Sequence, residues 1–269
     1  MKFKCTFTGV DESTSFTDLE SLIAEFPFIE FGILYSDAWY PTPRPRYPSL
    51  DFIKEFAAWF YGYYSSHPEQ QSHGSIALHI CGDAVFDLLN IGDGHSEPSE
   101  RPELKKLIPD FDRVQLNINL KIKLIDGIDW MKAAIGWKLE DLVKEYSRPF
   151  ILQYNDNNAH MLDFILSYYK NNYIHILKDA SGGKGLVIDD FSLPKTAIRC
   201  GIGFAGGIDC NNVKAILDKV HNNVMAANVE GNNDNKLYWI DMESSVRTDD
   251  KFDLNKVRQI ATIVKDIIK

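Results

Sequence analysis

The first candidates for chemistry in this sequence are small and polar residues placed directly after apolar runs. Three such runs end near positions 179, 205 and 241, and glycines or serines follow each of them. Glycine lets backbone N–H groups approach an anion closely, and a helix that starts just beyond adds positive potential. If these loops meet, they predict a phosphate site; otherwise each is an ordinary tight turn. The candidate donors are Gly182, Gly183, Gly185, Gly206, Gly207, Ser244 and Ser245.

Acidic residues and a histidine at the ends of apolar runs are candidates for proton transfer. Asp179 would suit a general acid if burial raises its pKa, although it could simply cap the glycine turn. Asp241 ends a later run, and alternation alone does not decide whether Asp241 or Glu243 faces a pocket. His79 could work with Asp83 as acid and base, but a histidine held by a neighbouring group is the commoner arrangement.

Two arginines lie in a proline-rich loop that spans residues 36–48. Proline fixes the backbone, so Arg44 and Arg46 are held on a stiff segment. A rigidly held guanidinium suits the planar carboxylate of a ligand. In an acidic protein, an ordinary ion pair explains the same residues equally well.

These residues need a scaffold that brings distant strand ends together. Eight apolar or alternating runs predict strands, and a 3.6-residue periodicity typical of helices follows most of them. The predicted strands span 2–8, 28–35, 75–80, 113–118, 149–154, 173–179, 197–203 and 237–241. A capping box of Thr17 and Glu20 predicts one helix start, and Ser49 predicts another. Other helices are expected over 84–89, 139–146, 157–169, 211–220 and 253–268, with irregular structure over 91–109 and 180–195.

Regular alternation of strand and helix implies parallel pairing through right-handed crossovers. Eight units without a second composition regime predict an α/β fold, a single (β/α)8 TIM barrel over residues 1–269 with an abbreviated crossover after the sixth strand. In such a barrel, the loops after the strands gather at one face, and the last of them commonly hold a phosphate.

Composition excludes several classes of partner. The chain has 269 residues, 45% of them apolar, and a formal net charge of −9. This charge argues against nucleic acid or an anionic membrane as a partner, because both require a basic field. The sequence has neither a signal-peptide pattern nor an apolar run near the ~18 residues of a membrane span. Four cysteines without metal-binding spacing predict reduced thiols in a cytoplasmic protein. We expect a small phosphorylated substrate and neither a metal nor an organic cofactor.

Short segments resemble the phosphoribosylanthranilate isomerase family in both content and order. Thr6–Val10 corresponds to the end of the family's first strand, and Arg46-Tyr47 to its second loop. The sequence Val-Gln-Leu at 114–116 corresponds to the fourth strand, with Asn117 where the family has histidine. Further matches lie at 179–185, 205–208, 212–213 and 240–246.

The family consists of single barrels of tryptophan biosynthesis that perform an Amadori rearrangement of an N-phosphoribosyl amine. The resemblance implies that Asp179 is the general acid, that Arg46 binds a carboxylate and that the glycines hold the phosphate. The family's general base is a cysteine, and Thr8 stands at its position here. Asp11 is the substitute if its loop folds over the site. Further substrate contacts are expected from His79, Gln115, Asn117 and Asp241.

The sequence therefore predicts an isomerase-like barrel that binds a phosphorylated sugar, with an unusual residue at the base position. Two alternatives stay open: a non-catalytic barrel that binds a phosphosugar or anion, and an enzyme with a different phosphorylated substrate, in which Asp11 or His79 is the base. An aldolase would need a Schiff-base lysine inside the barrel. Lys178 is the candidate on the sixth strand, but next to Asp179 it should point outward.

Overall fold

The computed structural model describes residues 2–36, 44–70, 73–91, 102–118, 128–168, 173–179, 186–192, 201–229 and 237–268. The predicted glycines Gly182, Gly183 and Gly185 lie outside these residues. In the described part of the chain, no helix combines the length and the hydropathy that a membrane crossing requires.

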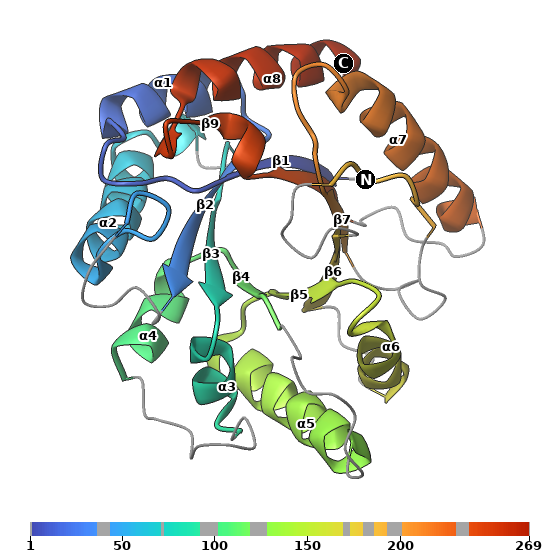
Figure 1. The fold of residues 1–269 in the computed structure, drawn as a ribbon. Coiled ribbons are helices and arrows are strands. Elements are labelled where there is room, and N and C mark those ends of the chain that lie inside the picture. Colours follow the sequence, from blue (N-terminus) through green and yellow to red (C-terminus); the bar gives the residue numbers. More distant parts are fainter. Residues whose placement is uncertain are drawn as a thin grey trace.

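Eight parallel strands close into a barrel in strict chain order, from β1 to β8 and back to β1, as Figure 1 shows along the barrel. The barrel confirms the predicted α/β class and the (β/α)8 architecture. The strands are β1 (Lys2–Thr8), β2 (Ile29–Ser36), β3 (Ile76–Cys81), β4 (Arg113–Leu116), β5 (Phe150–Tyr154), β6 (Ile174–Asp179), β7 (Ile202–Ala205) and β8 (Leu237–Met242).

Helices surround the barrel and cover its outer face (Figure 1). Their buried residues recur at the spacing of one helical face, as in the final helix, where Val257, Ile260 and Val264 pack inward. The helices are α1 (Phe16–Glu25), α2 (Leu50–Ser66), α3 (Ala84–Leu89), α4 (Pro102–Leu107), α5 (Ile128–Tyr146), α6 (Ala159–Tyr168), α7 (Val213–Val229) and α8 (Leu254–Ile267).

Several local predictions were wrong. Helix α1 is capped by Ser15, which accepts from the backbone N–H of Asp18, so Thr17 lies inside the helix and does not cap it. Residues 102–107 form α4, although the whole of 91–109 was expected to be irregular. The seventh strand begins at Ile202, five residues later than predicted.

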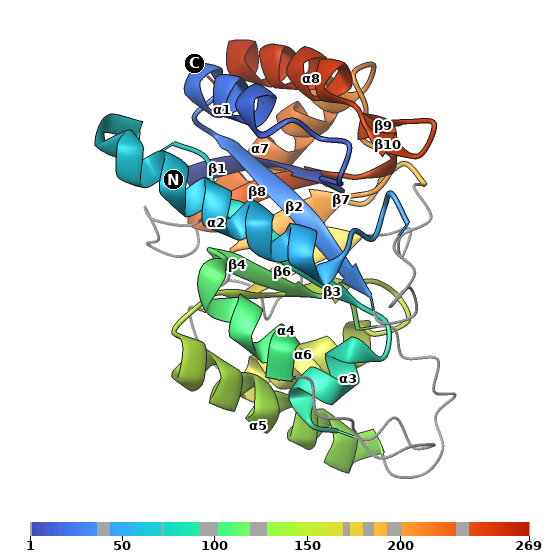
Figure 2. The same ribbon diagram turned by 90° about the vertical axis from the view of Figure 1, so that its left-hand side faces the viewer.

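A short hairpin after β8 was also missed. Strands β9 (Arg247–Thr248) and β10 (Lys251–Phe252) pair antiparallel. Figure 2 shows the hairpin from the side, at the end of the barrel where the parallel strands terminate. Here it lies beside the loops that were expected to carry the site.

The lower half of the barrel interior holds an ion pair and a tryptophan. Arg113 of β4 donates to the Glu30 carboxylate on β2, and Thr6 also donates to it. The Arg113 guanidinium lies 4.3 Å from the centre of the Trp239 ring. Gly203 makes room for that ring, because a Cβ there would lie 2.1 Å from it. All four side chains of this charged and aromatic layer are buried.

Candidate functional site

A cavity of about 430 Å³ opens at the C-terminal ends of the strands, directly above this layer. It collects ten of the predicted site residues: Thr8, His79, Gln115, Asn117, Asp179, Gly206, Gly207, Asp241, Ser244 and Ser245. Because the strand ends of a parallel barrel meet at one rim, residues up to 237 positions apart in the chain line the same space. Asp11, Arg46 and Lys178 are not among the lining residues.

Asp179 is the last residue of β6 and is almost fully buried. Its Oδ2 accepts a hydrogen bond of 2.6 Å from Nε2 of Gln153 on β5. Gly206 lies against the other oxygen: a Cβ there would be 3.7 Å from Asp179 Oδ1 and only 2.7 Å from the carbonyl oxygen of Leu186. Gly206 also has a φ of +116°, which side-chain-bearing residues rarely adopt. The loop after β7 therefore packs closely onto the carboxylate.

Asp241 is the second buried carboxyl group of the cavity. Thr8 Oγ1 donates a hydrogen bond of 2.7 Å to Asp241 Oδ1. Burial raises the pKa of Asp241 to about 8, with a further rise from Glu243 and Glu30, while the Thr8 hydrogen bond partly offsets the increase. The Asp241 carboxyl group thus holds a proton near neutral pH and can transfer it to a ligand in the cavity.

The two carboxyl groups flank a single strand. Ala205 of β7 pairs in register with Asp179 on one side and with Asp241 on the other. Neighbouring strands lie roughly 4.8 Å apart, so the two Cα atoms are separated by about 10 Å. A small ligand above Ala205 can reach both carboxyl groups at once.

His79 and two amides form the opposite wall of the cavity. Burial lowers the pKa of His79 to about 4, so its ring is neutral at physiological pH. Gln115 Nε2 donates to Asn117 Oδ1 at 2.9 Å, and Asn117 Nδ2 contacts Cys81 Sγ at 3.1 Å. Asp83, the expected partner of His79, is exposed and does not line the cavity.

The loops after β7 and β8 bring together the described part of the predicted phosphate site. Gly206, Gly207, Ser244 and Ser245 all line the cavity. The start of α7 differs from the expectation, because Oδ1 of Asp209 accepts from the backbone N–H groups of Asn211 and Asn212 at 2.8 and 3.1 Å. Those helix N–H groups are capped internally, so the glycine and serine residues remain the candidate donors.

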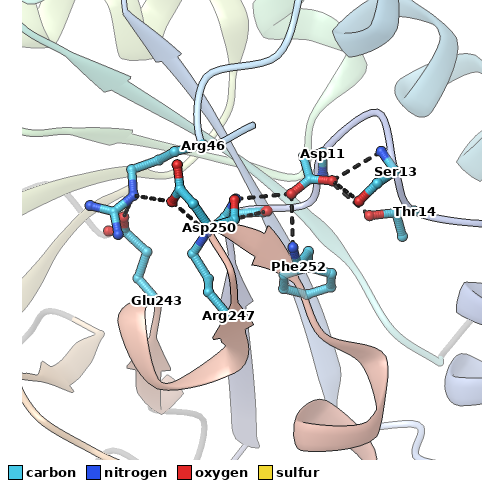
Figure 3. Close-up of polar contacts among 9 residues, drawn as sticks. Asp11, Ser13, Thr14, Arg46, Glu243, Arg247, Asp250 and Phe252 are labelled. Atoms are coloured by element: carbon cyan, nitrogen blue, oxygen red, sulfur yellow. Dashed lines mark hydrogen bonds and ion pairs between the residues drawn. The ribbon is translucent and has the colours of Figure 1, made fainter. Parts of the chain in front are cut away.

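Asp11 and Arg46 belong to a network of ion pairs beside the cavity, which Figure 3 shows. Arg247 of β9 donates to Asp11 Oδ2 at 2.9 Å, and the Phe252 N–H donates to the same oxygen at 2.8 Å. The Arg46 Nε atom lies 3.2 Å from Glu243 Oε1. Asp11 therefore does not reach the cavity, contrary to the substitute-base hypothesis, because the hairpin holds it. Arg46 forms the ordinary ion pair that was its alternative explanation.

Glu243 belongs to this network of ion pairs and also lines the cavity. Burial raises its pKa; Arg46 and Arg247 oppose the rise, and Asp179 adds to it. Lys178 points away from the site, as alternation predicted, and donates to Asp190 Oδ2 at 2.6 Å. Among the described residues, no three histidine, cysteine or acidic side chains cluster so that they could hold a metal ion.

Sequence reasoning missed Gln153 and Asp209, which both line the cavity. A signal for Gln153 was present, because it is a polar residue near the end of a predicted strand and two positions beyond the inward-facing Ile151. Asp209 gave no such signal, since it lies in an irregular loop whose geometry periodicity does not encode.

No protein-family model matches the sequence, and no curated protein matches it. Solved structures with a similar fold include the N-(5′-phosphoribosyl)anthranilate isomerase from Pyrococcus furiosus (TM-score 0.51, 13% identity, 99% of each chain covered). Monomers of the dimeric phosphoribosylanthranilate isomerase from Thermotoga maritima are also similar (TM-score 0.54, 13% identity, 99% of this chain and 100% of that chain). The phosphoribosyl anthranilate isomerase from Thermococcus kodakaraensis gives a TM-score of 0.50 at 13% identity, over 98% of this chain and 99% of that chain. Over nearly its whole length, this chain thus shares the barrel fold of those isomerases.

Proposed function

We propose that the protein is an acid–base isomerase of a phosphorylated sugar derivative, and that Asp179 and Asp241 are its proton-transfer residues. The observation that carries the proposal is their placement: both carboxyl groups face one cavity from the two sides of β7. Two carboxyl groups in different surroundings can act as acid and base in one site. The barrel fold shared with phosphoribosylanthranilate isomerases supports the same reaction class.

The roles follow from the surroundings of each group. Asp241 holds a proton near neutrality and is the donor, because burial raises its pKa to about 8. Asp179 lies on the other side of β7, where its Oδ2 accepts the amide N–H of Gln153 and is held toward the cavity, and it is assigned as the acceptor. This assignment reverses the role that the resemblance gives to Asp179. It also replaces the missing cysteine base, since the Thr8 hydroxyl only holds one oxygen of Asp241 in place.

The reaction balances with these two groups. Asp241 transfers its proton to the ring oxygen while the bond between C1 and that oxygen breaks, which opens the sugar. Asp179 then removes the proton from C2, which gives an enol or enolamine. Asp179 returns this proton to C1 while the C2 hydroxyl gives its proton to Asp241 and becomes a ketone, so both carboxyl groups end in the states in which they began. For an N-phosphoribosyl amine this sequence is an Amadori rearrangement. Gly206, Gly207, Ser244 and Ser245 hold the phosphate on the side of the cavity formed by the loops after β7 and β8.

Proton exchange at C2 tests the proposal without requiring the exact substrate. D-ribose 5-phosphate and phosphoribosylanthranilate are incubated with the protein in D₂O, and deuterium at C2 or a ketose product is followed by ¹H NMR. We expect exchange that falls at least ~10²-fold in Asp179→Asn and in Asp241→Asn, the usual size of one general acid–base contribution. Absence of exchange with both compounds, or exchange that survives both substitutions, would overturn the assignment.

A further inference from the structure

Two buried polar atoms on neighbouring strands of the cavity wall have no hydrogen-bond partner in the part of the chain that the structure describes. His79 of β3 pairs in register with Gln115 of β4, and both line the cavity. They are only 2% and 3% exposed. Neither Nε2 of His79 nor Oε1 of Gln115 has a partner among the described residues. A buried polar atom left unsatisfied costs about 1–3 kcal/mol, so the wall is built to receive a polar group.

The hydrogen-bond chain along β3 and β4 fixes what Gln115 can accept. Its Nε2 donates to Asn117 Oδ1, and the amide of Asn117 is in turn oriented toward Cys81. The orientation leaves the carbonyl oxygen of this cavity-lining residue without a partner among the described residues, and a carbonyl oxygen accepts hydrogen bonds only. The ligand atom opposite it must therefore carry a hydrogen. A carboxylate or phosphate oxygen has none to donate.

The charge of the cavity acts in the same direction. Besides Asp241, which holds its proton near neutral pH, three acidic residues line the cavity, Asp179, Asp209 and Glu243, and the described lining contains neither lysine nor arginine. His79 is neutral, so it brings no compensating charge to the wall. Its Nε2 can donate or accept, depending on the tautomer. An uncharged group that both donates and accepts is the match for this pair.

We propose that His79 and Gln115 bind a hydroxyl group of the sugar, and that this wall rejects a carboxylate or a bare aromatic face. The proposal rests on the proposed function for the sugar class and adds which part of the ligand lies at β3 and β4. The hydroxyl donates to Gln115 Oε1 and completes the hydrogen bonding of His79 Nε2. His79 and Gln115 are then specificity-determining residues, separate from the proton-transfer pair.

Binding of three sugars that differ by single hydroxyl groups tests the proposal. D-ribose 5-phosphate, 2-deoxy-D-ribose 5-phosphate and 3-deoxy-D-ribose 5-phosphate are titrated calorimetrically into the wild-type protein and into Gln115→Met. The wild-type protein should bind one of the two deoxy sugars at least ~5-fold more weakly than D-ribose 5-phosphate. This is the lower end of the loss expected when a hydrogen-bond acceptor is left unpaired. In Gln115→Met the acceptor is absent, so this ratio should fall below about 2-fold.

Gln259→Met is the matched control, because it makes the same chemical change at an exposed position on α8 and should keep the wild-type ratio. Equal affinity for all three sugars in wild type, no binding of any of them, or an unchanged ratio in Gln115→Met overturns the proposal. If Gln115→Met does not fold, a wild-type crystal with D-ribose 5-phosphate decides: a sugar oxygen must lie within ~3.2 Å of Gln115 Oε1. Water alone at that position also overturns it. C2 exchange is measured separately, so a failure of hydroxyl selectivity is distinguishable from a failure of isomerase activity.

Discussion

Replacement of Asp241 by asparagine should change how the free energy of unfolding depends on pH. The carboxyl group is buried in the folded protein, with a pKa of about 8. In the unfolded chain an aspartate titrates near pH 4. Between these two values the folded state keeps a proton that the unfolded state has released. The contribution to stability is therefore fully present below the unfolded pKa and is lost as the pH rises through about 8.

The size of the effect follows from the shift. Each pKa unit corresponds to about 1.36 kcal/mol, so a shift of about four units gives on the order of 5 kcal/mol across the full range. Asparagine does not titrate, and its side-chain oxygen can still accept from Thr8. The free energy of unfolding of Asp241→Asn minus that of wild type should thus increase with pH. We expect the increase to be steep between about pH 5 and pH 8 and to level off above.

Urea unfolding followed by tryptophan fluorescence measures this difference at a series of pH values. Subtracting the free energy of unfolding of wild type from that of Asp241→Asn at each pH removes the titration of groups that behave alike in both proteins. Asp179→Asn is the matched control, because it makes the same change at the other carboxyl group of the cavity. A difference that stays constant from about pH 5 to pH 9 would refute the reasoning. So would a ¹³C NMR titration that places the Asp241 pKa in the ordinary aspartate range.

Two stability predictions come from packing and charge. Arg247→Met leaves the buried carboxylate of Asp11 without its cation and should lower the free energy of unfolding by about 3–5 kcal/mol. Arg46→Met removes a partly exposed ion pair and should lower it by less than ~1 kcal/mol. Equal losses in urea unfolding would contradict this difference. Gly32→Ala places a Cβ 2.5 Å from Thr8 Oγ1 and 3.1 Å from the Thr8 Cα. It should cost about 1–3 kcal/mol in calorimetric unfolding, and an unchanged melting temperature would show that β1 and β2 do not approach as described.

Periodicity predicted the barrel because every strand carries its own apolar signal. Seven of the eight predicted strands agree with the observed ones to within two residues at either end. The seventh is displaced, since Gly201 and Gly203 have no side chains to mark which positions face inward. Helix α1 shows a second limit: Ser15 and Thr17 are both plausible caps, and local sequence does not decide between them.

The cavity was predictable as far as it depends on strand ends. Asp179 and Asp241 lie there because Asp179 ends β6 and Asp241 is the next-to-last residue of β8 in the same closed sheet. Asp11 was predicted at the site but does not line the cavity, because an ion pair with Arg247, 236 residues away, holds it. Contacts of that kind come from tertiary packing, which no local pattern encodes. The same holds for the perturbed pKa of Asp241, which depends on burial by several strands.

Trp239, beneath the cavity, affects how a ligand can enter and leave the site. Trp239, stacked under Arg113 and fitted against Gly203, fills the barrel axis one layer below Asp241. In the described part of the chain, the cavity is therefore closed toward the barrel interior and opens at the C-terminal ends of the strands. In the proposed reaction, a product formed in the cavity would leave at the C-terminal ends of the strands, where the next substrate also arrives, so product release and substrate binding would compete.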